Sequence, residues 1–219
     1  MSFDVQAIYE ARHYLLQGFL NTCALSFLGI IFSSMIGIVG AVVRVTGNKV
    51  SKTLLMIYIE FWRNTPIVAQ IFFLYFAFPL FGIKISAFNC GLTALVLHFS
   101  AYNIEVMRAG IEAVPEGLKE AGHALALSKF QRLKLVVIPL ALRLCLPALV
   151  NNYVSLLKNS ALVSVVGVVE LTFVAQDIIA DDFTFKEMYS TIAILYLILV
   201  FGLTWLLRRV EKRYAIELI

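Results

Sequence analysis

Charged residues are scarce in this sequence. Only 15% of its 219 residues are Asp, Glu, Lys or Arg, whereas 61% are hydrophobic. A soluble domain carries about a quarter charged and about half apolar residues. Membrane spans explain the excess, because each needs about 20 apolar residues to cross a bilayer. The composition therefore argues against a soluble domain and predicts an all-α polytopic membrane protein.

Cysteines are few and far apart. Cys23, Cys90 and Cys145 each lie in or beside an apolar run, with no CxxC spacing and no Cys/His cluster. Disulfide frameworks and zinc sites need paired or clustered cysteines. We interpret these three residues as small packing residues, and we expect no metal ligands.

Two further motifs are missing. No basic segment precedes the first apolar run, which starts after Gln17 and exceeds the roughly 7–15 apolar residues of a secretory signal. The chain also contains no GxxxxGK[ST] phosphate-binding motif, and its glycine–lysine neighbours at 47–49 and 117–119 lack that spacing. We therefore expect a retained first span, no catalytic residues and no ATP hydrolysis by that route.

Five apolar runs are present, each long enough to cross about 30 Å of hydrocarbon. They cover residues 18–43, 54–81, 90–107, 140 to about 174, and about 188–207. Residues 63–66 interrupt the second run, and polar residues in the over-long fourth run predict a break or a tilt. We expect an outer or interfacial segment at 1–17, a five-span domain at 18–210 and a cytoplasmic tail at 211–219.

Smaller features refine this picture. Gly18, Gly29, Gly37 and Gly40 of the first run permit close packing against another helix. Residues 4–12 could form a short interfacial helix before that run. The histidines at 98 and 123 are interpreted as packing or surface residues rather than proton relays.

Basic residues are unevenly distributed among the segments that join the runs. Cytoplasmic loops of membrane proteins are enriched in Lys and Arg. Only Arg12, Lys84 and Lys186 fall on one side, whereas twelve of the 18 basic residues fall on the other: Arg44, Lys49, Lys52, Arg108, Lys119, Lys129, Arg132, Lys134, Arg208, Arg209, Lys212 and Arg213. We expect the N-terminus outside and the C-terminus in the cytoplasm. The net charge of +4 then reflects topology, and we expect no nucleic-acid partner.

A polar segment, PEGLKEAGHALALSKFQRLKLVVIP, separates the third and fourth runs at residues 115–139. Pro115 and Glu116 suit the first turn of a helix. Leu118, Ala121 and Leu125 then recur on one narrow apolar face. The charge distribution places this segment in the cytoplasm.

A second short helix is predicted within the same segment. Ser128 with Gln131 three residues later forms a capping-box pattern, and Pro139 is expected to end the helix. Residues 115–139, which we call the elbow, should therefore fold as two short helices. The elbow is either a docking surface for another protein or an ordinary solvated loop.

Two pairs of ionisable residues lie inside the runs. Glu60 and Arg63 are three residues apart and share a helix face, where they can pair, and Glu105 and Arg108 repeat this spacing. An ionisable side chain in hydrocarbon costs at least a few kcal/mol, which makes each a functional candidate. The alternative for both pairs is a structural clamp at a helix–helix contact.

Lys158, Asn159 and Ser160 interrupt the fourth run. Lys158 has no acidic neighbour in sequence or at helical spacing, so it could receive the carboxylate of an amino acid. Asn159, Ser160 or a broken helix end could bind the rest of such a substrate. Alternatively, Lys158 snorkels or pairs with Glu60 or Glu105 across the bundle.

Residues 120–143, EAGHALALSKFQRLKLVVIPLALR, resemble the EAA-type cytoplasmic loop of ABC importer membrane subunits, with Glu120 and Ala121 in the signature positions. Three further segments resemble the polar amino acid permease family: EFWRNTPIVAQIFFLYF, SAYNIEVMRAGIEAVP and SLLKNSALVSVVGVVEL. The resemblance covers about residues 18–210. Gly122 stands where the signature more often has a second Ala, and Ala126 stands where it usually has a turn glycine. Ala126 fits if the turn does not require a positive φ.

This resemblance implies a permease subunit of an ATP-driven importer for polar amino acids, in a bacterial inner membrane. The elbow would be its coupling loop, docking on separate ATP-binding subunits that carry ATP and magnesium. A second permease subunit, identical or different, an extracytoplasmic amino-acid-binding protein and membrane lipid would be its other partners, with no cofactor in this chain. The residues implied in coupling are Glu116, Glu120, Ala121, Gly122, Leu125, Ala126 and Ser128.

The resemblance also suggests a substrate class. Relatives with Arg-Asn at positions 63–64 and Lys-Asn-Ser at 158–160 look like acidic amino acid permeases, which favours glutamate or aspartate. The residues expected to line the path are Glu60, Arg63, Asn64, Lys158, Asn159 and Ser160. The alternative is a secondary transporter or channel, which would need a relay of stacked acids and an internal inverted repeat. Neither is visible in the sequence.

Overall fold

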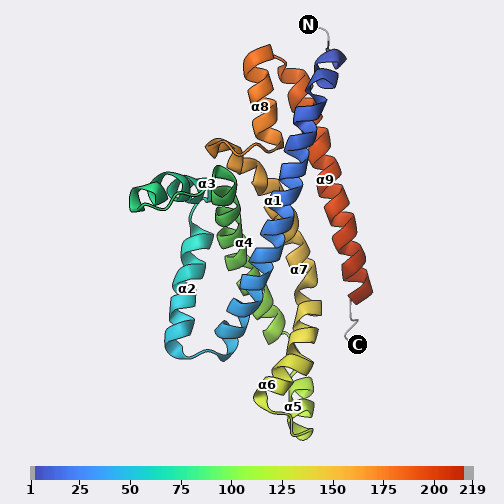
Figure 1. The fold of residues 1–219 in the computed structure, drawn as a ribbon. Helices are drawn as coiled ribbons and strands as arrows, with labels where there is room; N and C mark the ends of the chain where they lie inside the picture. Colours follow the sequence, from blue (N-terminus) through green and yellow to red (C-terminus); the bar gives the residue numbers. More distant parts are fainter. Residues whose placement is uncertain (1–2, 215–219) are drawn as a thin grey trace.

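The computed structural model describes residues 3–214, and every regular element in this range is helical (Figure 1). The first half contains α1 (Val5–Thr46), α2 (Lys49–Asn64), α3 (Ile67–Phe72), a π-helical turn (Phe73–Ala77), a 3-10 turn (Phe78–Phe81) and α4 (Ala87–Glu112). The second half contains α5 (Glu116–Ala124), α6 (Lys129–Arg132), a π-helical stretch (Leu133–Val137), α7 (Ile138–Asn159), a 3-10 stretch (Ser160–Val166), α8 (Leu171–Asp182) and α9 (Phe185–Tyr214).

Four helical segments are long and apolar enough to cross a membrane: α1, α4, residues 129–166 and α9. Helix α2 and residues 67–81 pass the same test together and make a fifth, although the chain bends by 108° between them. The predicted all-α, five-span fold is therefore confirmed, with one span bent. The predicted tail at 211–219 lies largely outside the described residues.

Helix α1 is longer than the first apolar run. The side chain of Asp4 caps it by accepting from the backbone N–H of Gln6 at 2.9 Å, and the helix then continues unbroken to Thr46. Residues 5–12 are helical as expected, but they continue into the first span and do not form a short helix of their own, because no proline or glycine lies between them and Gly18. Glu187 of α9 holds this end in place by accepting from the N–H of Asp4 at 2.9 Å.

The backbones of α1 and α4 approach closely. A Cβ atom added at Gly37 would lie 2.8 Å from the Cβ of Asn103, and one at Gly40 would lie 2.6 Å from the side chain of Ile104. Helix α4 also contacts α2 and α7, so it occupies the centre of the bundle (Figure 1). The predicted close packing along the glycines of α1 is confirmed at these positions.

Three apolar clusters hold the helices together along the length of the bundle. The first surrounds Ile71, Leu95 and Leu156 near the bend after α2. The second joins α1, α4 and α7 near the elbow, and the third joins α1, α8 and α9 at the opposite end. Distant parts of the sequence are thereby fixed side by side at both ends.

The fourth span starts earlier than predicted. Pro139 does not end the second elbow helix, because α6 passes through the wider π-helical stretch directly into α7. Pro139 lies in the first turn of α7, where a missing backbone N–H is tolerated. The elbow is therefore joined rigidly to the fourth span.

The same span breaks where polar residues were noted. Helix α7 ends at Asn159, a 3-10 stretch follows, and Gly167 adopts a left-handed conformation with φ of 77°. Such a conformation is open to glycine at little cost. The predicted break is confirmed, and α8 is a separate helix at the end of the bundle opposite the elbow (Figure 1).

The elbow contains the two predicted helices. The N–H of Ser128 donates to Oε1 of Gln131 at 2.9 Å, and the N–H of Gln131 donates to Oγ of Ser128 at 3.3 Å, so the capping box is confirmed. Between the helices, Leu127 N–H donates to the carbonyl of Gly122 at 3.2 Å and Ala126 adopts a φ of 52°. The turn therefore requires a positive φ, which costs a residue with a Cβ atom about 1–2 kcal/mol.

Replacing Ala126 by Gly should stabilise the elbow. The strain of the positive φ is removed, and part of this gain is offset because glycine makes the unfolded chain more flexible, which leaves about 0.5–1 kcal/mol. Hydrogen exchange of the amides at 125–127 should slow by about two- to five-fold. The control Ala124→Gly, at a helical position, should speed exchange; equal effects of both changes would contradict the account.

Candidate transport pathway and coupling surface

A bend between α2 and α3 opens the helix backbone inside the membrane. Pro66 caps α3, and the chain turns by 108° at this point. The buried amide of Gln70 closes the bend: its Nε2 donates to the carbonyl of Trp62 at 2.9 Å and to the carbonyl and hydroxyl of Thr65 at 3.1 and 2.6 Å. Backbone groups freed by a broken helix need such partners in hydrocarbon.

His98 of α4 supports this amide. Its Nδ1 lies 3.0 Å from Oε1 of Gln70, which accepts the hydrogen bond, and its ring centroid lies 5.2 Å from those of Phe99 and Tyr102. The interpretation of His98 as a packing residue is confirmed. Gln70 could have been noticed in the sequence as an isolated amide in an apolar run.

Three exposed polar side chains lie at the end of α2. Nδ2 of Asn64 donates to Oε2 of Glu60 at 2.6 Å, and the guanidinium of Arg63 lies 5.1 Å from the ring centroid of Tyr102. Within residues 3–214 no ion pair joins Glu60 to Arg63, so that expected pairing is wrong. Asn64, four residues after Glu60, donates to its carboxylate in place of Arg63. The guanidinium of Arg63 lies over the ring of Tyr102 instead.

Lys158 is exposed near the end of α7 and forms no ion pair within the described part of the chain. The alternative that it pairs with Glu60 or Glu105 is therefore not seen in this chain. Nδ2 of Asn159 donates to the carbonyl of Ser155 at 2.8 Å, and the buried hydroxyl of Ser160 donates to Leu157 at 2.7 Å. Among Lys158, Asn159 and Ser160, only Lys158 is exposed; Asn159 is half-buried and Ser160 is buried.

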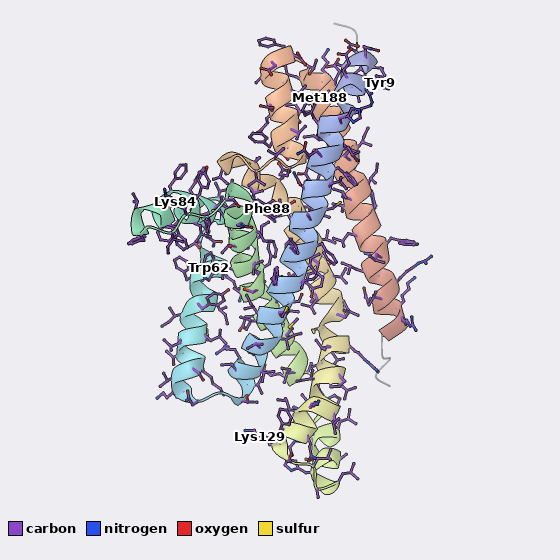
Figure 2. All side chains as sticks on the ribbon, viewed as in Figure 1. Tyr9, Trp62, Lys84, Phe88, Lys129 and Met188 are labelled. Atoms are coloured by element: carbon purple, nitrogen blue, oxygen red, sulfur yellow. The ribbon has the colours of Figure 1, made fainter. Side chains whose placement is uncertain are left out.

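The two backbone breaks lie together. The 3-10 stretch at 160–166 contacts both α3 and α4, and Val163 and Val166 share an apolar cluster with Ile67 and Ile71. Figure 2 shows Trp62 near the end of α2 that leads into α3, and Lys129 in the elbow at the opposite end of the bundle. The fold therefore brings the Arg63 and Lys158 segments to the same level of the bundle.

Glu105 forms a clamp between α1 and α4. Its carboxylate lies 2.9 Å from Nη2 of Arg108 and 3.4 Å from Nε of Arg44, and Arg108 also reaches Glu112 at 2.6 Å. The interpretation of the Glu105–Arg108 pair as a structural clamp is confirmed. The sequence did not indicate Arg44 as a partner of Glu105, because the two residues are 61 positions apart in the sequence and meet only when α1 packs against α4.

A buried amide ladder crosses the bundle. Nδ2 of Asn152 donates to Oδ1 of Asn103 at 3.2 Å, and Nδ2 of Asn103 donates to Oγ of Ser33 at 3.2 Å. Asn103 and Ser33 are fully buried. These bonds fix the register of α7, α4 and α1, and sequence reasoning missed Asn103 and Ser33 because single amides and hydroxyls are common in apolar helices.

Glu170 is a second feature missed by sequence reasoning. Its fully buried carboxylate caps α8 by accepting from Phe173 N–H at 2.8 Å, and it accepts from the hydroxyl of Tyr196 at 2.5 Å. Tyr196 lies 3.0 Å from the hydroxyl of Thr172. The contact fastens α8 to α9 at the end of the bundle away from the elbow.

The elbow exposes most of the residues implied in coupling. Glu116 begins α5 and pairs with Lys119 at 3.0 Å. The apolar face of α5 has no cover within the described residues, since Leu118 is 39% and Leu125 is 74% exposed. The other outward-facing members are Glu120, Ala121, Ala126 and Ser128.

Gly122 is the one buried member of this set. A Cβ atom there would lie 3.1 Å from the side chain of Arg132, closer than most such contacts. A second alanine here, as in the usual signature, would require the flexible Arg132 side chain to move by a few tenths of an ångström.

Comparison with known proteins agrees with this geometry. Residues 29–216 match the family described as binding-protein-dependent transport system inner membrane component. The chain is 36% identical over 218 residues to the glutamine transport system permease protein GlnP of Escherichia coli K12, covering 99% of this chain and 100% of that protein. It is 30% identical over 215 residues to the probable glutamine ABC transporter permease protein GlnM of Bacillus subtilis 168, with 96% and 100% covered.

A solved structure shares the fold. The crystal structure of an amino acid ABC transporter with histidines contains a chain with a TM-score of 0.89 and 33% identity, covering 97% of this chain and 100% of that chain. Such components carry solute while partner subunits hydrolyse ATP. The chain therefore belongs to the family of binding-protein-dependent transport system inner membrane components, as the permease subunit of an ABC amino acid importer.

Proposed function

We propose that this chain forms, with a second permease subunit, the pathway of an ATP-driven importer whose preferred substrate is glutamine. The relatives named above as glutamine permeases support this choice. Two ATP-binding subunits, which carry ATP and magnesium, dock on the elbows, and an extracytoplasmic binding protein delivers the amino acid. The elbow and the C-terminus face the cytoplasm, as the distribution of Lys and Arg favours.

The observation that carries the proposal is the group of exposed polar side chains at the two helix breaks. Glu60, Arg63 and Lys158 are charged, and all three are exposed within helices that otherwise resemble membrane spans. Ionisable groups at this depth normally face a bundle interior or a water-filled cavity. A solute path between two permease subunits supplies both.

The charges at the breaks suit an amino acid zwitterion. Arg63 and Lys158 can receive a carboxylate, and the Glu60 carboxylate can receive an ammonium group. These three charges sum to +1 and can receive the zwitterion of glutamine; the choice of glutamine over glutamate rests on the relatives named above.

An acidic substrate is the second candidate. Asn159 stands where the resemblance gives aspartate in many permeases for other polar amino acids, and its neutral amide leaves the path less negative. Glutamate or aspartate would then pair with Arg63 and Lys158. Nδ2 of Asn64 donates to Glu60, however, and the Glu60 carboxylate keeps one negative charge at the end of α2.

Coupling depends on the elbow. Its exposed apolar residues Leu118 and Leu125 would gain by entering a groove in the ATP-binding subunit. The unbroken path from α6 into α7 lets a movement of the elbow carry over to the break at 160–166. Closure of the ATP-binding subunits would thereby switch the pathway between outward-open and inward-open states.

The function is tested in proteoliposomes that contain this chain with its permease partner, ATP-binding subunits and binding protein. Glutamine should stimulate ATP hydrolysis and drive uptake, and glutamate and aspartate should do so at least about ten-fold less efficiently. Equal or better uptake of glutamate would favour the acidic candidate. Uptake by the permease alone, without nucleotide, would contradict the proposal and support a secondary transporter.

Replacing Lys158 by Met should impair transport without impairing assembly. Losing one charge-assisted hydrogen bond to the substrate costs about 1.5–3 kcal/mol, which corresponds to about a ten- to hundred-fold fall in uptake efficiency. The control Lys84→Met removes an exposed lysine from the loop before α4 and should transport normally. Normal uptake by the Lys158→Met complex would exclude a substrate role for this lysine.

A further inference from the structure

Helix α2 has three distinct faces. Its buried face carries Ile59, which is fully buried, and Tyr58, whose hydroxyl donates to the carbonyl of Leu97 at 2.9 Å and lies 2.6 Å from Oγ of Ser100. This face fastens α2 to α4. The remaining two faces are exposed and differ in chemistry.

The first exposed face is an apolar stripe. Val50, Leu54, Ile57 and Phe61 recur at spacings of four, three and four residues and are 68%, 64%, 62% and 53% exposed. Residues at these spacings lie on one side of a helix. Such a stripe suits lipid chains or an apolar protein surface.

The second exposed face is polar. It carries Lys49, Lys52, Thr53, Glu60, Arg63 and Asn64, with Met56 as its apolar member. Their spacings of three and four residues place them one above another along the helix. The face extends from the first to the last residue of α2, about 22 Å at 1.5 Å per residue.

An open surface depression of about 470 Å³ lies at the N-terminal end of this face, beside the turn that joins α1 to α2. Its polar lining comes from Arg44, Lys49, Lys52 and Thr53, with Ile57 of the apolar stripe at its edge, and no acidic residue lines it among the described residues. Arg44 is balanced by Glu105 at 3.4 Å. The excess positive charge therefore comes from Lys49 and Lys52, and Nζ of Lys52 is held toward the turn by the carbonyl of Val45 at 3.1 Å.

We propose that the polar face of α2 forms one continuous wall of the transport pathway, and that the depression at its end is a cationic exit vestibule for the carboxylate of the amino acid. The inference deepens the proposed function and rests on it. The vestibule attracts a carboxylate leaving the break, because cavities lined by one sign of charge raise the local concentration of the opposite charge. Lys49 and Lys52 thus act on release rather than on the first binding step.

The two exposed faces exclude the opposite assignment. If the polar face met lipid, Glu60 and Arg63 would lie in hydrocarbon, at a cost that natural helices avoid. If the apolar stripe lined the pathway, four large hydrophobic side chains would face water. The polar face of α2 is therefore assigned to the water-filled pathway, and the apolar stripe to lipid or an apolar protein surface.

Thiol labelling in the complete, active complex tests the wall. Cysteine is introduced by Thr53→Cys, Met56→Cys or, as the matched control on the apolar stripe, Leu54→Cys, after alanine has replaced the three native cysteines. A membrane-impermeant anionic methanethiosulfonate is added from the cytoplasmic side. The Thr53→Cys and Met56→Cys complexes should react at least about ten-fold faster than the Leu54→Cys complex, and their modification should reduce ATP-driven uptake at least about ten-fold.

Comparing anionic and cationic reagents tests the charge of the vestibule. Replacing both Lys49 and Lys52 by Gln in the Thr53→Cys complex should lower the anionic-to-cationic rate ratio by about three-fold or more. An unchanged ratio would overturn the cationic vestibule. Two results would contradict the assignment of the polar face as a wall of the pathway. One is that the Thr53→Cys complex reacts no faster than the Leu54→Cys complex, and the other is that its modification leaves uptake unchanged.

These failures are separable from failure of the proposed function. Before labelling, each variant complex is assayed for ATP-dependent amino acid uptake. Normal uptake with negative labelling removes the inference about α2 alone. Absence of ATP-dependent uptake in the unsubstituted complex removes the proposed function itself.

Discussion

Ionisable side chains are expensive in hydrocarbon, and this constraint governs the whole molecule. The chain satisfies it locally where helices meet: Glu105 is held by two arginines, and Glu170 by Tyr196 and a helix N-terminus. At the two breaks it does not, because Glu60, Arg63 and Lys158 remain exposed. These exposed charges are the reason for proposing that a second permease subunit and water face them.

Close packing around α4 makes such open polar groups tolerable. The glycines of α1 allow its backbone to approach α4, and the ladder from Ser33 through Asn103 to Asn152 fixes three helices in register. This centre holds the bend at Pro66 and the break after Asn159 at the same level of the bundle. Gln70, which hydrogen-bonds to His98, satisfies the backbone carbonyl of Trp62 at the bend.

Apolar run length and the Ser128–Gln131 pattern predicted most of the fold, because they reflect local physics. Span ends were less predictable: Pro139 lies in the first turn of α7, which follows a π-helical stretch without a break, and residues 5–12 are part of α1. The Glu60–Arg63 pairing was wrong because helix spacing alone cannot rank competing partners such as Asn64 and Tyr102. The long-range polar contacts were invisible, because they depend on which helices meet.

The central claim is that a separate ATP-binding subunit binds the elbow. A photoreactive amino acid placed at Leu125, which is 74% exposed, tests it in native inner membranes, with Phe183, 76% exposed at the opposite end of the bundle, as the control position. We expect position 125 to cross-link to a nucleotide-binding protein and position 183 not to do so. A cross-link to that protein from position 183, with none from position 125, would contradict the account.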